Sequence, residues 1–162
     1  MGAHEHPNAA LIARFYAALD RRDAAAMVAC YAPGATFSDP VFPSLDAAGV
    51  AAMWRMLCAR GKDLRVVASG IEANDAAGRA HWEATYSYSA TGRTVANRIE
   101  AAFAFRDGLI VRHDDRFDLW RWARQALGAP GWLLGWAPPM QRAIRAKAAQ
   151  TLAAWRAREA AA

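Results

Sequence analysis

The segment LIVRHDDRFD, residues 109–118, alternates strictly between two kinds of side chain and decides how the chain is expected to fold. In a β-strand successive side chains point to opposite faces, so one face would be mostly apolar and the other mostly charged. The mostly apolar face also carries His113 and Asp115. Because an unpaired buried carboxylate is costly, this face requires either a partner for Asp115 or a cavity that admits water and ligand.

Three segments upstream repeat this period of two. They are residues 64–71, 79–89 and 94–106, and turn sequences separate them at Asn74–Gly78, Thr91–Gly92 and Asp107–Gly108. Each segment has one apolar face. The sequence therefore predicts a meander of four antiparallel strands with a single buried face.

Helical spacing of apolar residues predicts three helices before the strands. The first follows a cap at Asn8 and ends near Asp20, the second starts near Asp23 and stops at the Pro33–Gly34 turn, and the third runs from a cap at Asp46 to Gly61. We expect the second helix to bury Tyr31, the third to bury Leu57, and Thr36–Asp39 to form a short extended piece that ends at Pro40. Helices against one face of a strongly curved sheet make an α+β architecture.

The segment after Asp118 differs in composition from the strands. Residues 119–127 are expected to be helical, 128–139 form a Trp-rich loop, and a final amphipathic helix follows. We expect one domain over residues 1–127, with 128–162 packed on the same domain or on a partner subunit. A helix lying on a membrane surface is the alternative for the final segment.

Composition narrows the class of protein. A chain of 162 residues fits one domain, and its net charge of +5 comes mostly from arginine without a basic run, so we expect no nucleic-acid partner. Two cysteines make no disulfide framework, which suits a reducing compartment. Met1–Asn8 lacks a targeting pattern, and no stretch approaches the about 18 apolar residues that span a bilayer. We expect a cytoplasmic protein without membrane insertion.

Three ionisable residues are the catalytic candidates: Asp39, His113 and Asp115. His113 and Asp115 would lie on one strand face about 7 Å apart between Cα atoms, and a satisfied buried pair is the alternative to a catalytic one. A turn-forming role is the alternative for Asp39, which precedes a proline. The candidates for a substrate-binding wall are Phe15, Phe37, Trp54, Trp82, Tyr86, Asn97 and Phe117, with Asn97 able to orient a carbonyl.

The sequence gives little support for a metal. His113, Asp115 and Asp39 could supply ligands, but no His-rich spacing is present, and His4 and His6 belong to the N-terminal segment. No phosphate-cradling glycine loop appears either. We therefore expect neither a metal nor another cofactor.

Four runs of sequence resemble a known superfamily. They are RFYAALD (14–20), YAPGATFSDP (31–40), FAFRDGLI (103–110) and HDDRFD (113–118), and they resemble the nuclear-transport-factor-like superfamily, more narrowly the SnoaL-like polyketide cyclases and ketosteroid isomerase. The likeness runs from about Asn8 to Leu127. It implies a cone-shaped fold, a small apolar ligand and a homodimer.

The resemblance to ketosteroid isomerase implies that Asp39 is a general base whose pKa is raised by an apolar pocket. The isomerase's catalytic tyrosine falls on Phe15, with Tyr16 about 100° round the helix, and its protonated acid falls on Ala101. Steroid isomerisation by that mechanism is therefore not expected.

The same scaffold is used by limonene epoxide hydrolase, whose water-activating aspartate falls on Asp115. The hydrolase's companion arginine and aspartate fall on Trp82 and Ala84. We expect a cofactor-independent protein that binds an apolar carbonyl compound and transfers a proton beside the carbonyl, as an isomerase or cyclase does. The alternatives are a non-catalytic ligand-binding or interaction domain, and hydration of the epoxide hydrolase type.

Overall fold

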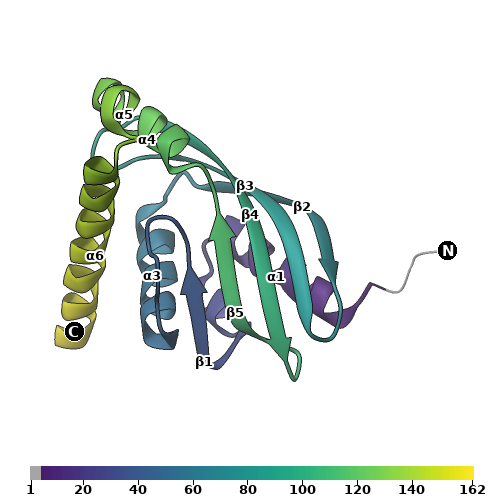
Figure 1. The fold of residues 1–162 in the computed structure, drawn as a ribbon. Coiled ribbons are helices and arrows are strands. Elements are labelled where there is room, and N and C mark those ends of the chain that lie inside the picture. The colour runs from purple at the N-terminus through teal and green to yellow at the C-terminus, as the bar shows by residue number, and fades with distance from the viewer. Residues whose placement is uncertain (1–4) are drawn as a thin grey trace.

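The computed structural model describes residues 5–162 and contains one five-stranded sheet (Figure 1). Strands β2 (Arg65–Ala73), β3 (Ala77–Ser87), β4 (Thr94–Arg106) and β5 (Leu109–Arg116) form the antiparallel meander that the sequence predicts. Strand β1 (Tyr31–Ser38) lies parallel to β5 and completes the order β1-β5-β4-β3-β2. The sequence predicts only a short extended piece here, Thr36–Asp39, whereas the strand starts five residues earlier.

Turn chemistry explains the tight hairpin between β4 and β5. Asp107 and Gly108 both have positive φ, 52° and 76°, as a two-residue hairpin turn requires at its central positions. The side chains of β4 then alternate between buried and exposed along nearly its whole length. This alternation fixes the register and keeps one face of the sheet in the core.

Two helices, α1 (Pro7–Asp20) and α3 (Ala47–Arg60), cover the buried face of the sheet (Figure 1), and the short helix α2 (Ala24–Val28) packs against both of them. Asp23 and Asp46 cap α2 and α3 by accepting bonds from Ala26 N and Gly49 N. The core between helices and sheet is a single large cluster of aliphatic and aromatic side chains. The expected α+β cone is therefore confirmed.

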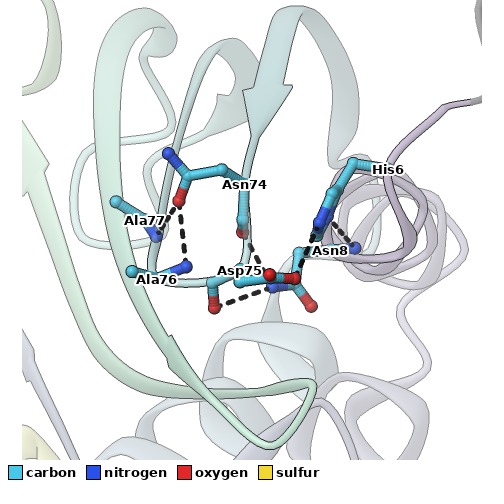
Figure 2. Close-up of polar contacts among 6 residues, drawn as sticks. All are labelled: His6, Asn8, Asn74, Asp75, Ala76 and Ala77. Carbon is cyan, nitrogen blue, oxygen red and sulfur yellow. Dashed lines mark hydrogen bonds and ion pairs between the residues drawn. The ribbon is translucent and has the colours of Figure 1, made fainter.

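The start of α1 differs from the sequence prediction. His6, not Asn8, caps the helix, because its imidazole Nδ1 accepts from Asn8 N at 3.1 Å and Pro7 occupies the first turn. The Asn8 side chain instead donates to the backbone carbonyls of Asn74 and Asp75 in the β2–β3 turn (Figure 2). Asn8 thus ties the first helix to the sheet. His4 lies outside the described residues.

The second helix is shorter than predicted, and Tyr31 belongs to a strand. Helix α2 ends at Val28, and Pro33 and Gly34 lie inside β1 instead of forming the turn that ends a helix. An edge strand tolerates a proline because one of its sides needs no N–H donor. The register of β1 against β5 is irregular between Tyr31 and Thr36, where Gly34 has a φ of 77°.

Residues 119–162 form what we call the C-terminal extension, which consists of α4 (Leu119–Leu127), α5 (Ala129–Leu134) and α6 (Pro138–Ala161). The expected loop over 128–139 contains the helix α5. A Cβ at Gly131 would lie 2.0 Å from the carbonyl oxygen of Ala123, so glycine is required for α5 to pack this closely on α4.

Helix α6 packs beside α3 (Figure 1). Arg55 donates from Nε and Nη2 to the two oxygens of Glu159 at 2.7 and 3.0 Å, and Arg145 Nε donates to the Pro40 carbonyl at 2.8 Å. Leu152 is the residue of α6 that is buried in the core. No helix in residues 5–162 is both long enough and apolar enough to cross a bilayer.

Candidate active site

The parallel pairing of β1 with β5 brings two distant acidic residues to one place. Phe37 lies opposite His113 and Ser38 opposite Asp114. Asp39 directly follows β1, and it lies near enough to Asp115 for that charge to raise its pKa. The Ser38 hydroxyl donates to Asp114 at 2.7 Å on the outer side of this pair. Asp39 and Asp115 both line a cavity of about 780 Å³.

Asp39 is held in a closed turn of backbone. Its Oδ1 accepts from Val41 N at 2.7 Å and Phe42 N at 2.6 Å, and its own N–H donates to the Phe42 carbonyl at 2.9 Å. Burial raises the pKa of the carboxyl to about 6, and the negative charge of Asp115 adds to the rise, while the two backbone N–H groups oppose it. Asp39 therefore stabilises a turn and also lines the cavity, where a carboxylate could act as a base.

A chain of hydrogen bonds leads from Asp115 into the core. Asp115 Oδ1 lies 2.9 Å from His113 Nε2 and also receives a bond from Trp82 Nε1 at 3.4 Å. His113 Nδ1 lies 2.7 Å from the Tyr31 hydroxyl, which accepts from Trp54 Nε1 at 3.0 Å. Because Asp115 accepts from Nε2, a neutral imidazole has Nδ1 free to accept the tyrosine proton.

His113 is fully buried and does not line the cavity. The ring of Phe103 lies 4.4 Å from the imidazole between centroids, Phe37 lies at 5.0 Å and Phe15 at 5.6 Å. Phe15 and Phe37, which the sequence suggested as wall residues, are therefore packed around the histidine behind the wall. Any effect of His113 on a ligand has to pass through Asp115.

The remaining predicted wall residues do line the cavity: Trp54, Trp82, Tyr86, Asn97 and Phe117. Most are aromatic and come from α3, β3 and the residue that follows β5. Asn97 is 9% exposed, and its carboxamide forms no hydrogen bond with any other described residue. It is thus a polar group on the cavity wall that a ligand oxygen could use.

One wall of the cavity comes from the C-terminal extension, which sequence reasoning did not place there. Met140, Ile144, Lys147 and Thr151 of α6 all line it. Leu57, expected to be buried, is 38% exposed and lies at the same cavity. The apolar stripe of α6 was visible in the sequence, but its alternation does not say which surface the helix covers.

Tyr16 lies near Asp115 without lining the cavity. Its ring is 5.3 Å from the Trp82 ring, and its buried hydroxyl has no hydrogen-bond partner among residues 5–162. Burial raises its pKa well above the usual value, and the charge of Asp115 raises it further. Tyr16 therefore stays neutral beside Asp115.

The described residues contain no group of three or more His, Cys, Asp or Glu side chains arranged to hold a metal ion. The two acids at the cavity already form hydrogen bonds within the protein: Asp39 accepts from the backbone of its own turn, and Asp115 accepts from His113. What the arrangement offers chemically is a carboxylate with a raised pKa, a second carboxylate and a free carboxamide in mostly aromatic surroundings. These are the parts needed for proton transfer at an apolar compound.

Residues 12–113 match the family model described as the SnoaL-like domain. A candidate polyketide cyclase from Xanthomonas campestris pv. campestris superposes with a TM-score of 0.61 and 23% identity, covering 74% of this chain and 96% of its own. The candidate polyketide cyclase IdmH from Streptomyces antibioticus superposes with a TM-score of 0.64 and 22% identity, covering 76% of this chain and 100% of its own. A candidate SnoaL-like polyketide cyclase from a Jannaschia species superposes with a TM-score of 0.68 and 13% identity, covering 80% of this chain and 98% of its own. The comparison with curated proteins gives no match.

Proposed function

Because the chain belongs to the SnoaL-like domain family, we propose that its cavity takes up a small apolar carbonyl compound and catalyses proton transfer next to the carbonyl, as an isomerase or cyclase does. One observation carries the proposal. Asp39 and Asp115, which are 76 positions apart in the sequence, line the same mostly aromatic cavity. Solved structures of similar fold that are named as candidate polyketide cyclases support the same class of reaction.

Asp39 is the general base in this proposal. Oδ1 is occupied by Val41 N and Phe42 N, so Oδ2 is the oxygen left to take a proton from the carbon beside the carbonyl. The C–H bonding electrons move into a C=C bond, and the carbonyl oxygen becomes an enolate. A pKa of about 6 keeps Asp39 ionised near neutral pH and brings it closer to the range in which a base is efficient.

Asn97 and Asp115 complete the site. The Asn97 amide N–H donates to the developing enolate oxygen. The proton on Asp39 then returns to another carbon of the substrate, which gives an isomer. Alternatively, the enolate carbon attacks a second carbonyl of the same molecule, which closes a ring, and the alkoxide formed there takes the proton from Asp39. Asp115 faces the ligand, while His113 and Tyr31 are positioning residues that hold the Asp115 carboxylate through hydrogen bonds.

The experiment measures exchange of α-protons for deuterium in D2O, followed by mass spectrometry over a panel of cyclic ketones and diketones. Asp39→Asn should lower the exchange rate by about 10²- to 10⁴-fold. Asparagine keeps an oxygen for Val41 N and Phe42 N, so the melting temperature should not fall. Asp114→Asn is the matched control, because Asp114 lies one residue from Asp115 but bonds to Ser38 and Arg112 on the outer face. Equal exchange rates in the wild type and in Asp39→Asn would show that Asp39 is not the general base.

A second candidate is a non-catalytic ligand-binding domain. Asp115 already receives bonds from His113 and Trp82, as a buried acid with a purely structural role would. Ligand binding by calorimetry without any α-proton exchange would favour this candidate. A diol carrying oxygen from labelled water would instead favour hydration through Asp115. The homodimer implied by the family resemblance stays a prediction, which sedimentation velocity can test.

A further inference from the structure

The net charge of the protein is concentrated in the C-terminal extension. Residues 1–118 contain 13 Lys and Arg against 14 Asp and Glu, a net charge of −1. Residues 119–162 contain seven Lys and Arg against Glu159 alone, a net charge of +6. Glu159 is moreover paired with Arg55 of α3. A charge difference of this kind between two parts of one chain indicates a surface that meets an anionic partner.

The same extension carries an exposed apolar tip, which we define as Trp132, Leu133, Leu134 and Trp136. Their exposed fractions are 57, 71, 53 and 60%. Among the large hydrophobic side chains of residues 5–162, only Leu57 and Val67 are exposed elsewhere. The tip lies on and just after α5, at the upper end of the molecule and away from the core (Figure 1). Clustered exposed apolar groups at such a position mark an interaction site.

Two indole N–H groups at the tip bond to backbone carbonyls of the protein itself. Trp136 Nε1 donates to the Leu133 carbonyl at 3.0 Å, and Trp120 Nε1 donates to the Trp132 carbonyl at 3.4 Å. The surface that the tip presents outward is therefore mainly aromatic and aliphatic.

Three arginines lie at the Trp132 side of this apolar surface. The Arg124 guanidinium stacks at 4.5 Å over the Trp120 ring and at 4.7 Å over the Trp132 ring. Arg93 and Arg121 line one shallow depression together with Arg124 and Trp132. None of the three arginines forms an ion pair with an acidic side chain in the described part of the chain. Their charge is available to phosphate groups outside the protein.

We propose that the tip and its arginines dock the protein on an anionic lipid bilayer, with Trp132, Leu133 and Leu134 in the interface and the guanidinium groups at the lipid phosphates. Tryptophan favours the level of the lipid headgroups, and clustered arginines are attracted by anionic lipids. Leu133 and Leu134 have no flat π-face for a nucleic-acid base to stack on, which favours lipid over nucleic acid. The inference is independent of the proposed function.

The test is co-sedimentation of the full chain with phosphatidylcholine vesicles, with and without about a third of phosphatidylglycerol. Binding should require the anionic lipid, weaken with salt, and shift tryptophan emission to the blue. Arg121→Gln with Arg124→Gln should weaken binding by about five-fold per arginine. Leu133→Ser with Leu134→Ser should weaken it at least about ten-fold.

The matched controls are Arg65→Gln with Arg106→Gln for charge, and Val67→Ser for an exposed apolar group on β2. These should bind as the wild type does, and circular dichroism shows whether each variant folds. Equal binding to both kinds of vesicle would overturn the proposal, as would equal losses in the tip variants and the controls. It would also be overturned if the tip variants changed the sedimentation coefficient without lipid, since the tip would then be an interface between copies of the chain.

Discussion

Residues 5–118 and the C-terminal extension place their charged and apolar side chains in opposite ways. The first region buries His113 and Asp115 among aromatic rings, at 0 and 5% exposure. The extension leaves Trp132 and Leu133 in solvent and keeps its charges outside as well. Since buried charge and exposed apolar surface both cost free energy, each region departs from an ordinary globular protein in its own direction.

The difference separates two tasks within one chain. The cost of burying an acid is usual where a carboxylate has to react, and the cost of an exposed apolar tip is usual where a surface has to bind. The two regions meet at the cavity, because α6 supplies one of its walls. Three measurements test whether the two regions differ in this way.

The largest effect is expected from His113→Ala. The substitution leaves the Asp115 carboxylate and the Tyr31 hydroxyl without their partner and opens a cavity between aromatic rings. The free energy of unfolding should fall by about 3–5 kcal/mol, measured by urea denaturation. His81→Ala is the control, because His81 pairs with Glu100 on the outer face of the sheet. If both variants lost the same free energy of unfolding, the buried hydrogen bonds of His113 would contribute no more to stability than an exposed pair does.

A smaller effect is expected from the pH dependence of Asp39. Its pKa of about 6 in the folded protein lies above the value of 3.8 for an exposed aspartate, so the folded state binds the proton more tightly. The stabilisation is full below pH 4 and is lost as the pH rises through 6. Asp39→Asn should therefore exceed the wild type by up to about 3 kcal/mol at pH 8 and match it below pH 4. Thermal unfolding at both pH values checks this, and a constant difference would contradict the raised pKa.

The smallest effect is expected from Glu159→Gln, which removes the acid of the extension. Arg55 and Glu159 are both partly exposed, and such pairs contribute little in water. The melting temperature should fall by at most about 3 °C at low salt, and the difference should shrink in high salt. Scanning calorimetry at two salt concentrations is the measurement. A large drop would mean that this pair, and not Leu152, is what holds α6 against the core.

Sequence reasoning was most successful where a local period determines the structure. Strand β4 has the predicted bounds of Thr94–Arg106, and α1 ends at Asp20 as expected. Each face of these elements is defined by neighbours a few positions away, so the pattern suffices. Asp23 and Asp46 begin their helices for the same reason, since a cap acts on a backbone N–H two or three residues further along.

The position of Tyr31 is one that local spacing in the sequence does not predict. Its spacing from Met27 fits a helix, yet the chain leaves α2 at Val28 because parallel pairing with β5 outweighs local preference. Because the sequence does not predict β1 as a strand beside β5, it does not predict the hydrogen bond between Tyr31 and His113 either. The cavity wall from α6 was missed on similar grounds, because no local pattern tells a helix which distant surface it will cover.

The pairing of β1 with β5 also has a consequence for biosynthesis. The bond from Ser38 to Asp114 spans 76 positions, and the closure of such a long loop is slow compared with the formation of helices and hairpins. A nascent chain that has emerged only as far as β4 has no partner for β1, so the backbone hydrogen-bonding groups of that strand stay unpaired until the ribosome releases residues 109–116. We expect this interval of translation to be the one in which the chain depends most on a chaperone.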